Sequence, residues 1–237
     1  MKILALDSTA QVASVALCED GALLGEYTIN NGNTHSETLL PMVESLLGFF
    51  DLTPAEIDLF GVSAGPGSFT GVRIGAATVK GLAFAMNRPC AGVSTLEALA
   101  YNLVGCNGLI CPVMNARRKQ VYTALFQCHD DVIERLLPDS AIAIEELDGI
   151  LKVYNEPIYL CGDGYAITKQ YLTTPTKDTP ERLRHQSAYS VAQIALLKYQ
   201  RGENLSDDTT LAPTYLRLSQ AERERLEKQN SAPNIPI

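Results

Sequence analysis

Short apolar runs separated by polar turns fill the first thirty positions of the chain. The apolar runs cover residues 2–6, 12–18 and 23–29, and polar turns lie at residues 8–11 and 19–21. Runs of this length, bounded by turn residues, are typical of β-strands. Because the turns are short, we expect the three strands to form an antiparallel meander. This start differs from the strand-helix unit that opens a dinucleotide-binding fold.

The pattern then changes to helical spacing. Thr34 and Glu37 have the spacing of a capping box, and an apolar stripe with a period of 3–4 residues follows over residues 39–50. Next come a predicted strand at residues 57–64, a glycine-rich turn at 65–71 and a predicted helix at about 72–86. Apolar or small residues cover this second helix on nearly all sides. A helix without a wide polar face packs against neighbours on more than one side.

The second half of the chain repeats the first. An ungapped alignment pairs Leu6-Asp7 with Met114-Asn115 and Leu17 with Leu125, a constant offset of 108 residues. A third strand at about 132–136 is followed by a helix at 144–151, a strand at 157–161, a glycine turn at 162–164 and a helix at 187–200. A repeat this long predicts two similar domains. We place them at residues 1–106 and 107–218, followed by a flexible tail at 219–237.

Three antiparallel strands followed by crossover helices and further strands form a ribonuclease-H-like unit. Two such units in tandem predict an α/β protein with the fold of the actin-like ATPase (ASKHA) superfamily, which includes sugar kinases. The 237 residues are sufficient for two cores, because 46% of them are hydrophobic and only 19% are charged.

Charge and hydropathy narrow the functional classes. The formal net charge is −8, and an overall negative field repels nucleic acid. Asp7 interrupts the first apolar run well before the length of a signal peptide, and no uncharged run of membrane-spanning length follows. We therefore expect a soluble, cytoplasmic protein without a membrane partner.

The turn at residues 65–71 and the end of the first strand are the candidates for phosphate chemistry. The turn lacks the Gly-Lys-Ser/Thr of a P-loop, but amides at a helix start can hold an anion. Asp7, Ser8, Gly65, Gly67 and Ser68 therefore form a candidate vestigial nucleotide or phosphate site. Alternatively, the glycines permit a tight connection and Asp7 is a turn residue. In the second half the residue matching Asp7 is Asn115, which removes one carboxylate of the pair that phosphoryl chemistry uses.

Few other residues suggest chemistry. The six cysteines form no C-x-x-C pair and the three histidines have no metal-ligand spacing, so we expect reduced core thiols and no metal site. His35 has no predicted nucleophile beside it and is expected to be solvated or capping. The basic cluster at residues 117–119 is either a solvated turn or a patch for a nucleotide, tRNA or an acidic partner.

The run Gly65-Pro66-Gly67-Ser68-Phe69-Thr70-Gly71-Val72-Arg73-Ile74-Gly75 resembles the hallmark of the TsaB (YeaZ) family. Further matching segments lie in the same order at residues 3–9, 35–37, 40–43, 92–96 and 213–217. The resemblance is dense to about residue 125 and thinner to about 217. It implies an actin-like two-domain fold and a role in forming N6-threonylcarbamoyladenosine at position 37 of tRNAs that read codons starting with A.

The resemblance also implies that the chemistry lies in other subunits. TsaC makes the threonylcarbamoyl-adenylate, and TsaD, a paralogue of TsaB, holds the metal and transfers the group. TsaE is an ATPase that acts on the TsaB–TsaD pair. TsaD-type relatives carry a His-x-x-x-His pair after a Gly-Val step, whereas Thr95 and Leu99 occupy those positions here. We therefore expect no catalytic residue, no metal and no tightly bound cofactor, with a candidate nucleotide at the interface shared with TsaD.

The implied partner surface lies on the two helices of the first domain, which in the family form a four-helix bundle with TsaD. The predicted interface residues are Leu39, Leu40, Val43, Leu46, Leu47, Val72, Ile74 and Val79. We expect them to be exposed in the isolated chain, which would then pair with itself as a homodimer, and to bind TsaD and help recruit TsaE in the complex. The expected contact with tRNA is indirect.

Two other functions fit parts of the sequence. An actin-like ATPase or small-molecule kinase is favoured by Asp7 and the glycine turns and opposed by Asn115. A metal-dependent peptidase is opposed by the missing histidine pair.

Overall fold

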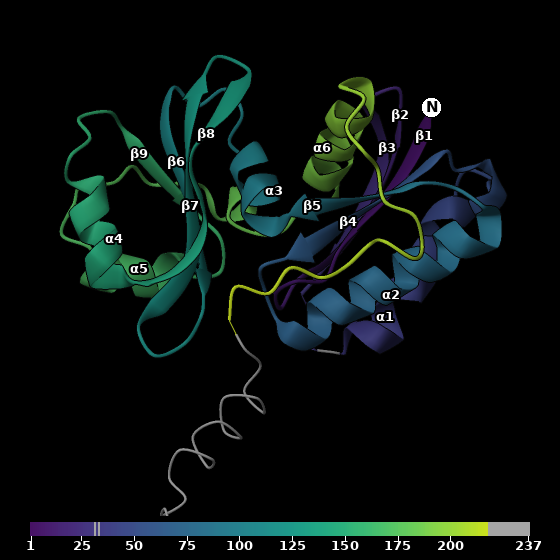
Figure 1. Ribbon diagram of the computed structural model, residues 1–237, viewed down its shortest axis with the longest axis horizontal. Helices are drawn as coiled ribbons and strands as arrows, with labels where there is room; N and C mark the ends of the chain where they lie inside the picture. Colours follow the sequence, from purple (N-terminus) through teal and green to yellow (C-terminus); the bar gives the residue numbers. More distant parts are fainter. Residues whose placement is uncertain (31, 33, 218–237) are drawn as a thin grey trace, which may run out of the picture.

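Each half of the chain is built on one β-sheet, as the computed structural model shows for residues 1–30, 32 and 34–217 (Figure 1). The first sheet has the order β3-β2-β1-β4-β5 and the second has the order β8-β7-β6-β9. The strands of the first sheet are β1 (Lys2–Asp7), β2 (Ala13–Glu19), β3 (Ala22–Ile29), β4 (Leu59–Gly65) and β5 (Cys90–Ser94). Those of the second are β6 (Gly108–Asn115), β7 (Gln120–His129), β8 (Val132–Ala143) and β9 (Ile158–Cys161).

The strand pairing confirms the predicted fold. β1, β2 and β3 form an antiparallel meander, and β4 joins β1 in parallel, as does β5 to β4. The second sheet repeats this arrangement, because β6, β7 and β8 are antiparallel and β9 is parallel to β6. The two halves are therefore ribonuclease-H-like units in the tandem arrangement of the actin-like fold.

Helices cover both faces of both sheets. The helices are α1 (His35–Gly48), α2 (Phe69–Met86), α3 (Thr95–Tyr101), α4 (Ile144–Leu151), α5 (Tyr165–Tyr171) and α6 (Ala188–Gln200), with short 3-10 turns at Pro54–Glu56 and Glu181–Leu183. α1 and α2 pack on one face of the first sheet, where Leu39, Val43 and Leu46 meet Leu4 and Leu6. Coverage on both faces explains why β1 is almost entirely apolar.

Each half also contributes a helix to the other half, which the sequence did not predict. α6 packs on the first sheet, where Val191 and Ala195 contact the cluster of Ile3 and Ala5. α3 packs on the second sheet, where Leu99 joins the cluster of Phe126. A division at residue 106 thus separates the two sheets but not the helices packed on them. Figure 1 shows α3 and α6 between the sheets.

The structure corrects two local expectations. Thr34 precedes α1, but its side chain makes no capping hydrogen bond, and the amide of Glu37 donates to the Thr34 carbonyl instead. A capping box is present at Thr53 and Glu56.

The helix that directly follows the second glycine turn is α5, not the predicted helix at 187–200, which is α6. The predicted tail at 219–237 lies outside the described residues.

Five of the six cysteines are buried, which confirms the prediction of core thiols. Desolvation raises the pKa of Cys18 to about 12 and that of Cys90 to about 11. Within the described part of the chain, no helix combines the length and apolar character needed to cross a membrane.

Candidate functional site

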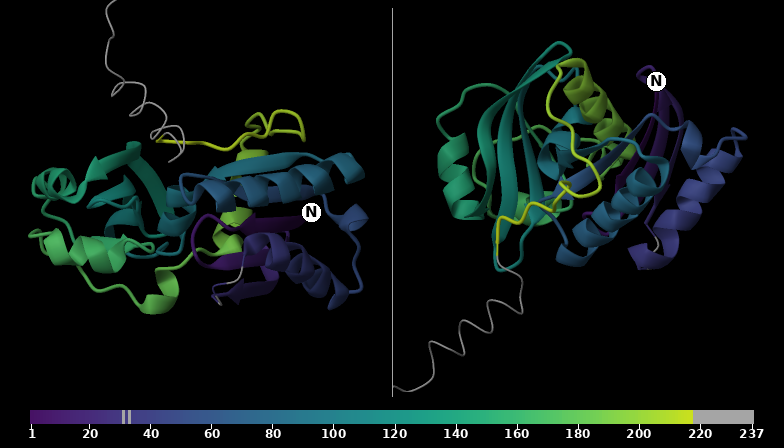
Figure 2. Two further views of the ribbon diagram at one scale, coloured as in Figure 1. Left: turned by 90° about the horizontal axis from the view of Figure 1, so that it is seen from below. Right: turned by 45° about the vertical axis from the view of Figure 1, so that its right-hand side comes forward.

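A cleft of about 850 Å³ lies between the two halves. The first half lines it with residues 9–11, 66–70 and 73, and the second half with residues 114–117, 122 and 163. The C-terminal segment at 214–217 closes one side. The chain from residue 201 to residue 217 follows α6, runs along the first half and reaches the second half (Figures 1 and 2).

The glycine turn forms one wall of the cleft and packs tightly on the turn after β1. A Cβ atom on Gly67 would lie 2.5 Å from the Thr9 carbonyl oxygen, and one on Gly71 would lie 1.9 Å from the Ser8 carbonyl oxygen. The amide of Ser68 donates to the Thr9 carbonyl at 2.6 Å. Close backbone approach therefore accounts for these glycines.

Asp7 is buried and hydrogen-bonded within the protein. Its side chain is 0% exposed and accepts bonds from the Thr9 amide at 2.9 Å, the Thr9 hydroxyl at 2.7 Å and the Ser63 hydroxyl. Desolvation raises the pKa of this carboxyl, although the three bonds act in the opposite direction. The carboxylate is thus part of a turn and does not face the cleft.

The candidate phosphate site is therefore only partly in place. Ser8 is buried and its hydroxyl donates to the Gly71 carbonyl at 2.9 Å. Gly65 has φ of +114° and lies against the Thr214 carbonyl. Only Gly67 and Ser68 of the five predicted residues line the cleft. Asp7, Ser8 and Gly65 do not line the cleft, because each is enclosed by neighbouring chain segments.

The turn after β6 repeats the turn after β1. The Asn115 side-chain oxygen accepts from the Arg117 amide at 2.8 Å, as the Asp7 carboxylate accepts from Thr9. Asn115 is exposed to the cleft, and its backbone N–H donates to the Asp163 carboxylate at 3.2 Å. Desolvation raises the pKa of Asp163. Asp163 is the one carboxylate among the described residues that line the cleft, so these residues provide no carboxylate pair for a metal–phosphate complex.

The described residues also lack a group of three His, Cys, Asp or Glu side chains suited to a metal ion. Thr95 and Leu99, which stand where TsaD-type relatives have histidines, are 0% and 1% exposed and belong to the packed helix α3. The His35 ring nitrogen Nε2 lies 2.6 Å from the Ala10 carbonyl oxygen. Thr95 and Leu99 are thus packed inside the protein, and His35 is held by a local contact.

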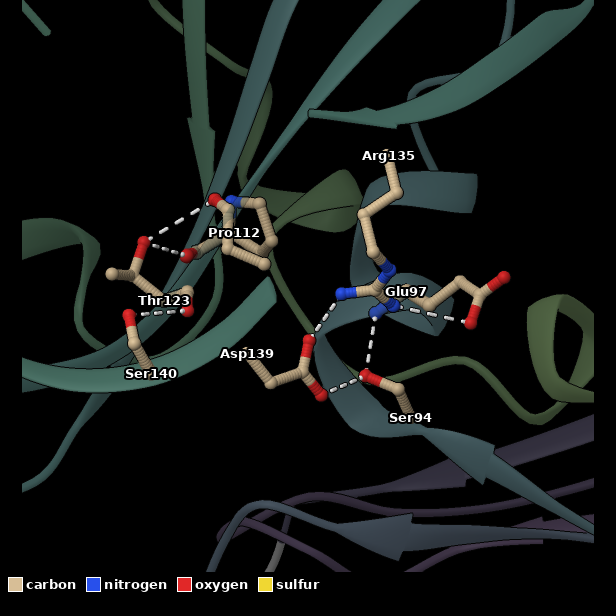
Figure 3. A network of polar contacts seen from close by, with 8 residues as sticks. Ser94, Glu97, Pro112, Thr123, Arg135, Asp139 and Ser140 are labelled. Atoms are coloured by element: carbon tan, nitrogen blue, oxygen red, sulfur yellow. Dashed lines mark hydrogen bonds and ion pairs between the residues drawn. The ribbon is translucent and has the colours of Figure 1, made fainter. Parts of the chain in front are cut away.

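Polar contacts join the two halves of the chain. Ser94 at the start of α3 donates to Asp139 on β8 at 2.5 Å, and Arg135 on β8 pairs with both Asp139 and, at 3.2 Å, Glu97 on α3 (Figure 3). On the other side, Arg217 donates to the Ala116 carbonyl at 2.6 Å. These contacts connect the end of β5, the helix α3 and the C-terminal segment to the second half of the chain.

The predicted partner surface is mostly core. Of its eight residues, six are at most 3% exposed and pack beneath α1 and α2: Leu39, Val43, Leu46, Leu47, Val72 and Val79. Leu40 is 46% exposed and Ile74 is partly buried. The expectation that the whole set is exposed in the isolated chain is therefore wrong, because the apolar stripe of each helix covers the chain's own sheet.

A different set of side chains is exposed on α1 and α2 and just after α1. Phe84 is 73% exposed and Phe49, just after α1, is 77% exposed. Ala77 and Gly81 are also exposed on α2, one and two turns from Arg73. This face, defined by Leu40, Phe49, Ala77, Gly81 and Phe84, is called the outer helix face below. The sequence identifies Ala77 and Gly81 as small residues of a helix, but it does not indicate that they face away from the sheet.

Comparisons with known proteins extend over both halves of the chain. A family model described as TsaD, tRNA N6-adenosine threonylcarbamoyltransferase, matches residues 23–225. A Bacillus subtilis (strain 168) relative named tRNA threonylcarbamoyladenosine biosynthesis protein TsaB is 33% identical over 97% of this chain and 100% of its own length. An Escherichia coli (strain K12) protein of the same name is 36% identical over 54% of this chain and 55% of its own. The solved structure of YeaZ from Pseudomonas aeruginosa matches with a TM-score of 0.79 and 26% identity, covering 91% of this chain and 99% of that one.

Proposed function

Because the chain belongs to the TsaB family, we propose that it is a non-catalytic subunit of the machinery that forms N6-threonylcarbamoyladenosine at position 37 of tRNAs reading codons starting with A. The observation that carries this proposal is the similarity to the B. subtilis TsaB protein, which extends over all of that protein's length. The match to the TsaD family model over residues 23–225 supports the same pathway.

The geometry of the cleft supports a role without chemistry. The Asp7 carboxylate accepts three hydrogen bonds from within the protein. Asn115, at the matching position of the second half, has a neutral side-chain amide instead of a second carboxylate. Thr95 and Leu99 are buried and offer no imidazole. A subunit of this kind acts by binding a partner and stabilising the partner's active conformation.

The outer helix face is the proposed docking site for TsaD. Leu40, Phe49 and Phe84 expose apolar surface there, and burial of such surface drives association. Ala77 and Gly81 allow a partner helix to approach α2 closely. We expect the isolated chain to pair with itself through the same face, TsaD to displace one copy, and the TsaB–TsaD pair to recruit TsaE.

Reconstitution tests the proposal directly. Purified TsaC, TsaD and TsaE are combined with tRNA, threonine, bicarbonate and ATP, with or without this chain, and the modified nucleoside is quantified over many turnovers. We expect sustained formation only when the chain is present. Equal rates in its absence would contradict the proposed activation of TsaD.

The interdomain cleft favours one second candidate, an actin-like-fold ATPase or small-molecule kinase, because it lies where two ribonuclease-H-like units meet. The enclosed Asp7 and the neutral Asn115 oppose it. ATP turnover by the isolated chain, above that of an Asn115→Ala variant, would support this candidate instead.

A further inference from the structure

The rim of the cleft carries charge of the opposite sign to the chain as a whole. The net charge is −8, yet the described cleft residues include three arginines, Arg73, Arg117 and Arg217, and one carboxylate, Asp163. Arg118 and Lys119 follow Arg117 in the β6–β7 turn and both are exposed, but the Lys119 ammonium lies 4.5 Å from the centre of the Tyr171 ring on α5. A local positive potential against an overall negative field concentrates anions at that place.

The β6–β7 turn holds these cations in an uncommon backbone conformation. Arg117, Arg118 and Lys119 have φ of 64°, 53° and 57°, the left-handed region that residues other than glycine seldom adopt. Hydrogen bonds fix the turn: the Gln120 amide donates to the Arg117 carbonyl at 3.0 Å, and the Ile144 amide donates to the Lys119 carbonyl at 3.1 Å. The turn thus holds three consecutive cationic residues on a fixed backbone, and Arg117 among them lines the cleft.

Aromatic rings lie next to the cations. The rings of Phe69 and Tyr215 stack with centroids 4.5 Å apart, and the Arg73 guanidinium lies 3.9 Å from the centre of the Phe69 ring. Tyr215 is 41% exposed, and Tyr122 lines the cleft from the second half. Positive charge interleaved with accessible aromatic surface is the combination that binds single-stranded nucleic acid, since phosphates meet the cations and bases stack on the rings.

The structure favours a phosphodiester chain over a magnesium-bound mononucleotide. Three amides at the start of α2, those of Ser68, Gly71 and Val72, donate within the chain to Thr9 and Ser68. The described cleft residues also lack the second carboxylate that a metal ion would need. Phosphate groups would therefore be held by side chains at the rim, as in backbone contacts to RNA.

We propose that the cleft rim binds a single-stranded segment of RNA directly, with Arg73, Arg117, Arg118 and Arg217 on its phosphates and Tyr215 offering a stacking surface. The inference rests on the proposed function, under which the RNA is the tRNA being modified. It replaces the expectation that tRNA contact is only indirect.

The test is fluorescence anisotropy of a labelled tRNA anticodon stem-loop with the purified full chain at several salt concentrations. Arg73→Gln and Arg118→Gln each remove one rim cation. Arg201→Gln is the matched control, because Arg201 is an exposed arginine at the end of α6. We expect each rim variant to weaken binding by about 3- to 10-fold, with a salt dependence reduced by about one phosphate contact, and the control to bind like the unmodified chain.

Competition experiments separate the sources of the anion. Unlabelled stem-loop should displace the probe, whereas AMP or polyglutamate at the same phosphate or carboxylate concentration should not. Equal displacement by AMP would point to a mononucleotide site, and equal displacement by polyglutamate to an acidic protein partner; either result overturns the proposal. Absence of measurable RNA binding, or equal losses in the rim and control variants, overturns it as well. None of these outcomes depends on whether the chain activates TsaD, which reconstitution measures separately.

Discussion

Gly81→Lys separates docking on the outer helix face from folding of the chain. Gly81 lies in the interior of α2, and a Cβ atom added there meets nothing within 4 Å. The lysine side chain would therefore extend into solvent in the free chain. In a complex docked through this face, it would lie in the contact.

Gly81→Lys should have opposite effects on the stability of the free chain and on its binding to TsaD. Glycine in a helix interior is less favourable than most residues by about 0.5–1 kcal/mol, so the free chain should keep its stability or gain about that amount. At roughly 2–4 °C per kcal/mol for a chain of this size, the melting temperature should rise by up to about 4 °C. In the complex, an unpaired ammonium taken out of water costs several kcal/mol. Even about 1.4 kcal/mol of this would weaken TsaD binding tenfold.

Thermal denaturation and titration calorimetry with TsaD measure the two effects. Gly149→Lys is the matched control, because Gly149 lies in α4 of the second half and a Cβ atom there also meets nothing within 4 Å. We expect both variants to be as stable as the unmodified chain, and only Gly81→Lys to lose TsaD affinity. Full affinity of a folded Gly81→Lys variant would refute docking through this face.

Three further outcomes follow from the structure. Leu46→Glu should unfold the chain or make it insoluble, as circular dichroism would show, because Leu46 is 2% exposed within the core. Arg135→Ala should lower the free energy of unfolding by only about 1 kcal/mol, since its ion pairs are partly exposed, but should speed hydrogen exchange in α3. Unchanged exchange would argue against these contacts holding α3 on β8. Desolvation disfavours ionisation of Asp148, but hydrogen bonds from one lysine and two threonines outweigh it and hold the pKa of this carboxyl below its ordinary 3.8. Its contribution to stability is therefore present above about pH 3.8 and is lost as the pH falls. Denaturation curves at several pH values should show that Asp148→Asn has a lower free energy of unfolding at pH 7, and that this free energy depends less on pH below pH 4.

Strand patterns and the internal repeat were predictable because they depend on local sequence. The three-strand meander and the helix at residues 144–151 match the structure, and the offset alignment correctly pairs the turns after β1 and β6. Alternating and periodic apolar positions fix the type of each element and the face it buries.

Which surface covers the apolar face of a helix depends on residues distant in sequence, and the predictions about these surfaces were wrong. The small apolar residues of α6 indicate a buried helix but do not specify which sheet it covers. The stripe containing Leu46 likewise covers the chain's own sheet rather than a partner. Burial on one side of α2 leaves Phe84 and Gly81 on the other, and only the three-dimensional arrangement distinguishes the two sides.

The role of Asp7 depended on contacts distant in sequence. Its bonds to Thr9 could be anticipated from an Asx turn, but the bond from Ser63 on β4 required the parallel pairing of β1 and β4. The basic turn at residues 117–119 was recognised in the sequence. Its left-handed backbone, and the position of Arg117 in the same cleft as Phe69 and Tyr215, emerged only from the fold.

Mass spectrometry of tRNA nucleosides after depletion of this chain would measure whether the cell needs it to form threonylcarbamoyladenosine. We expect threonylcarbamoyladenosine to fall while other modified nucleosides stay at their normal levels, before growth slows. Normal threonylcarbamoyladenosine in fully depleted cells would contradict a required role in this pathway.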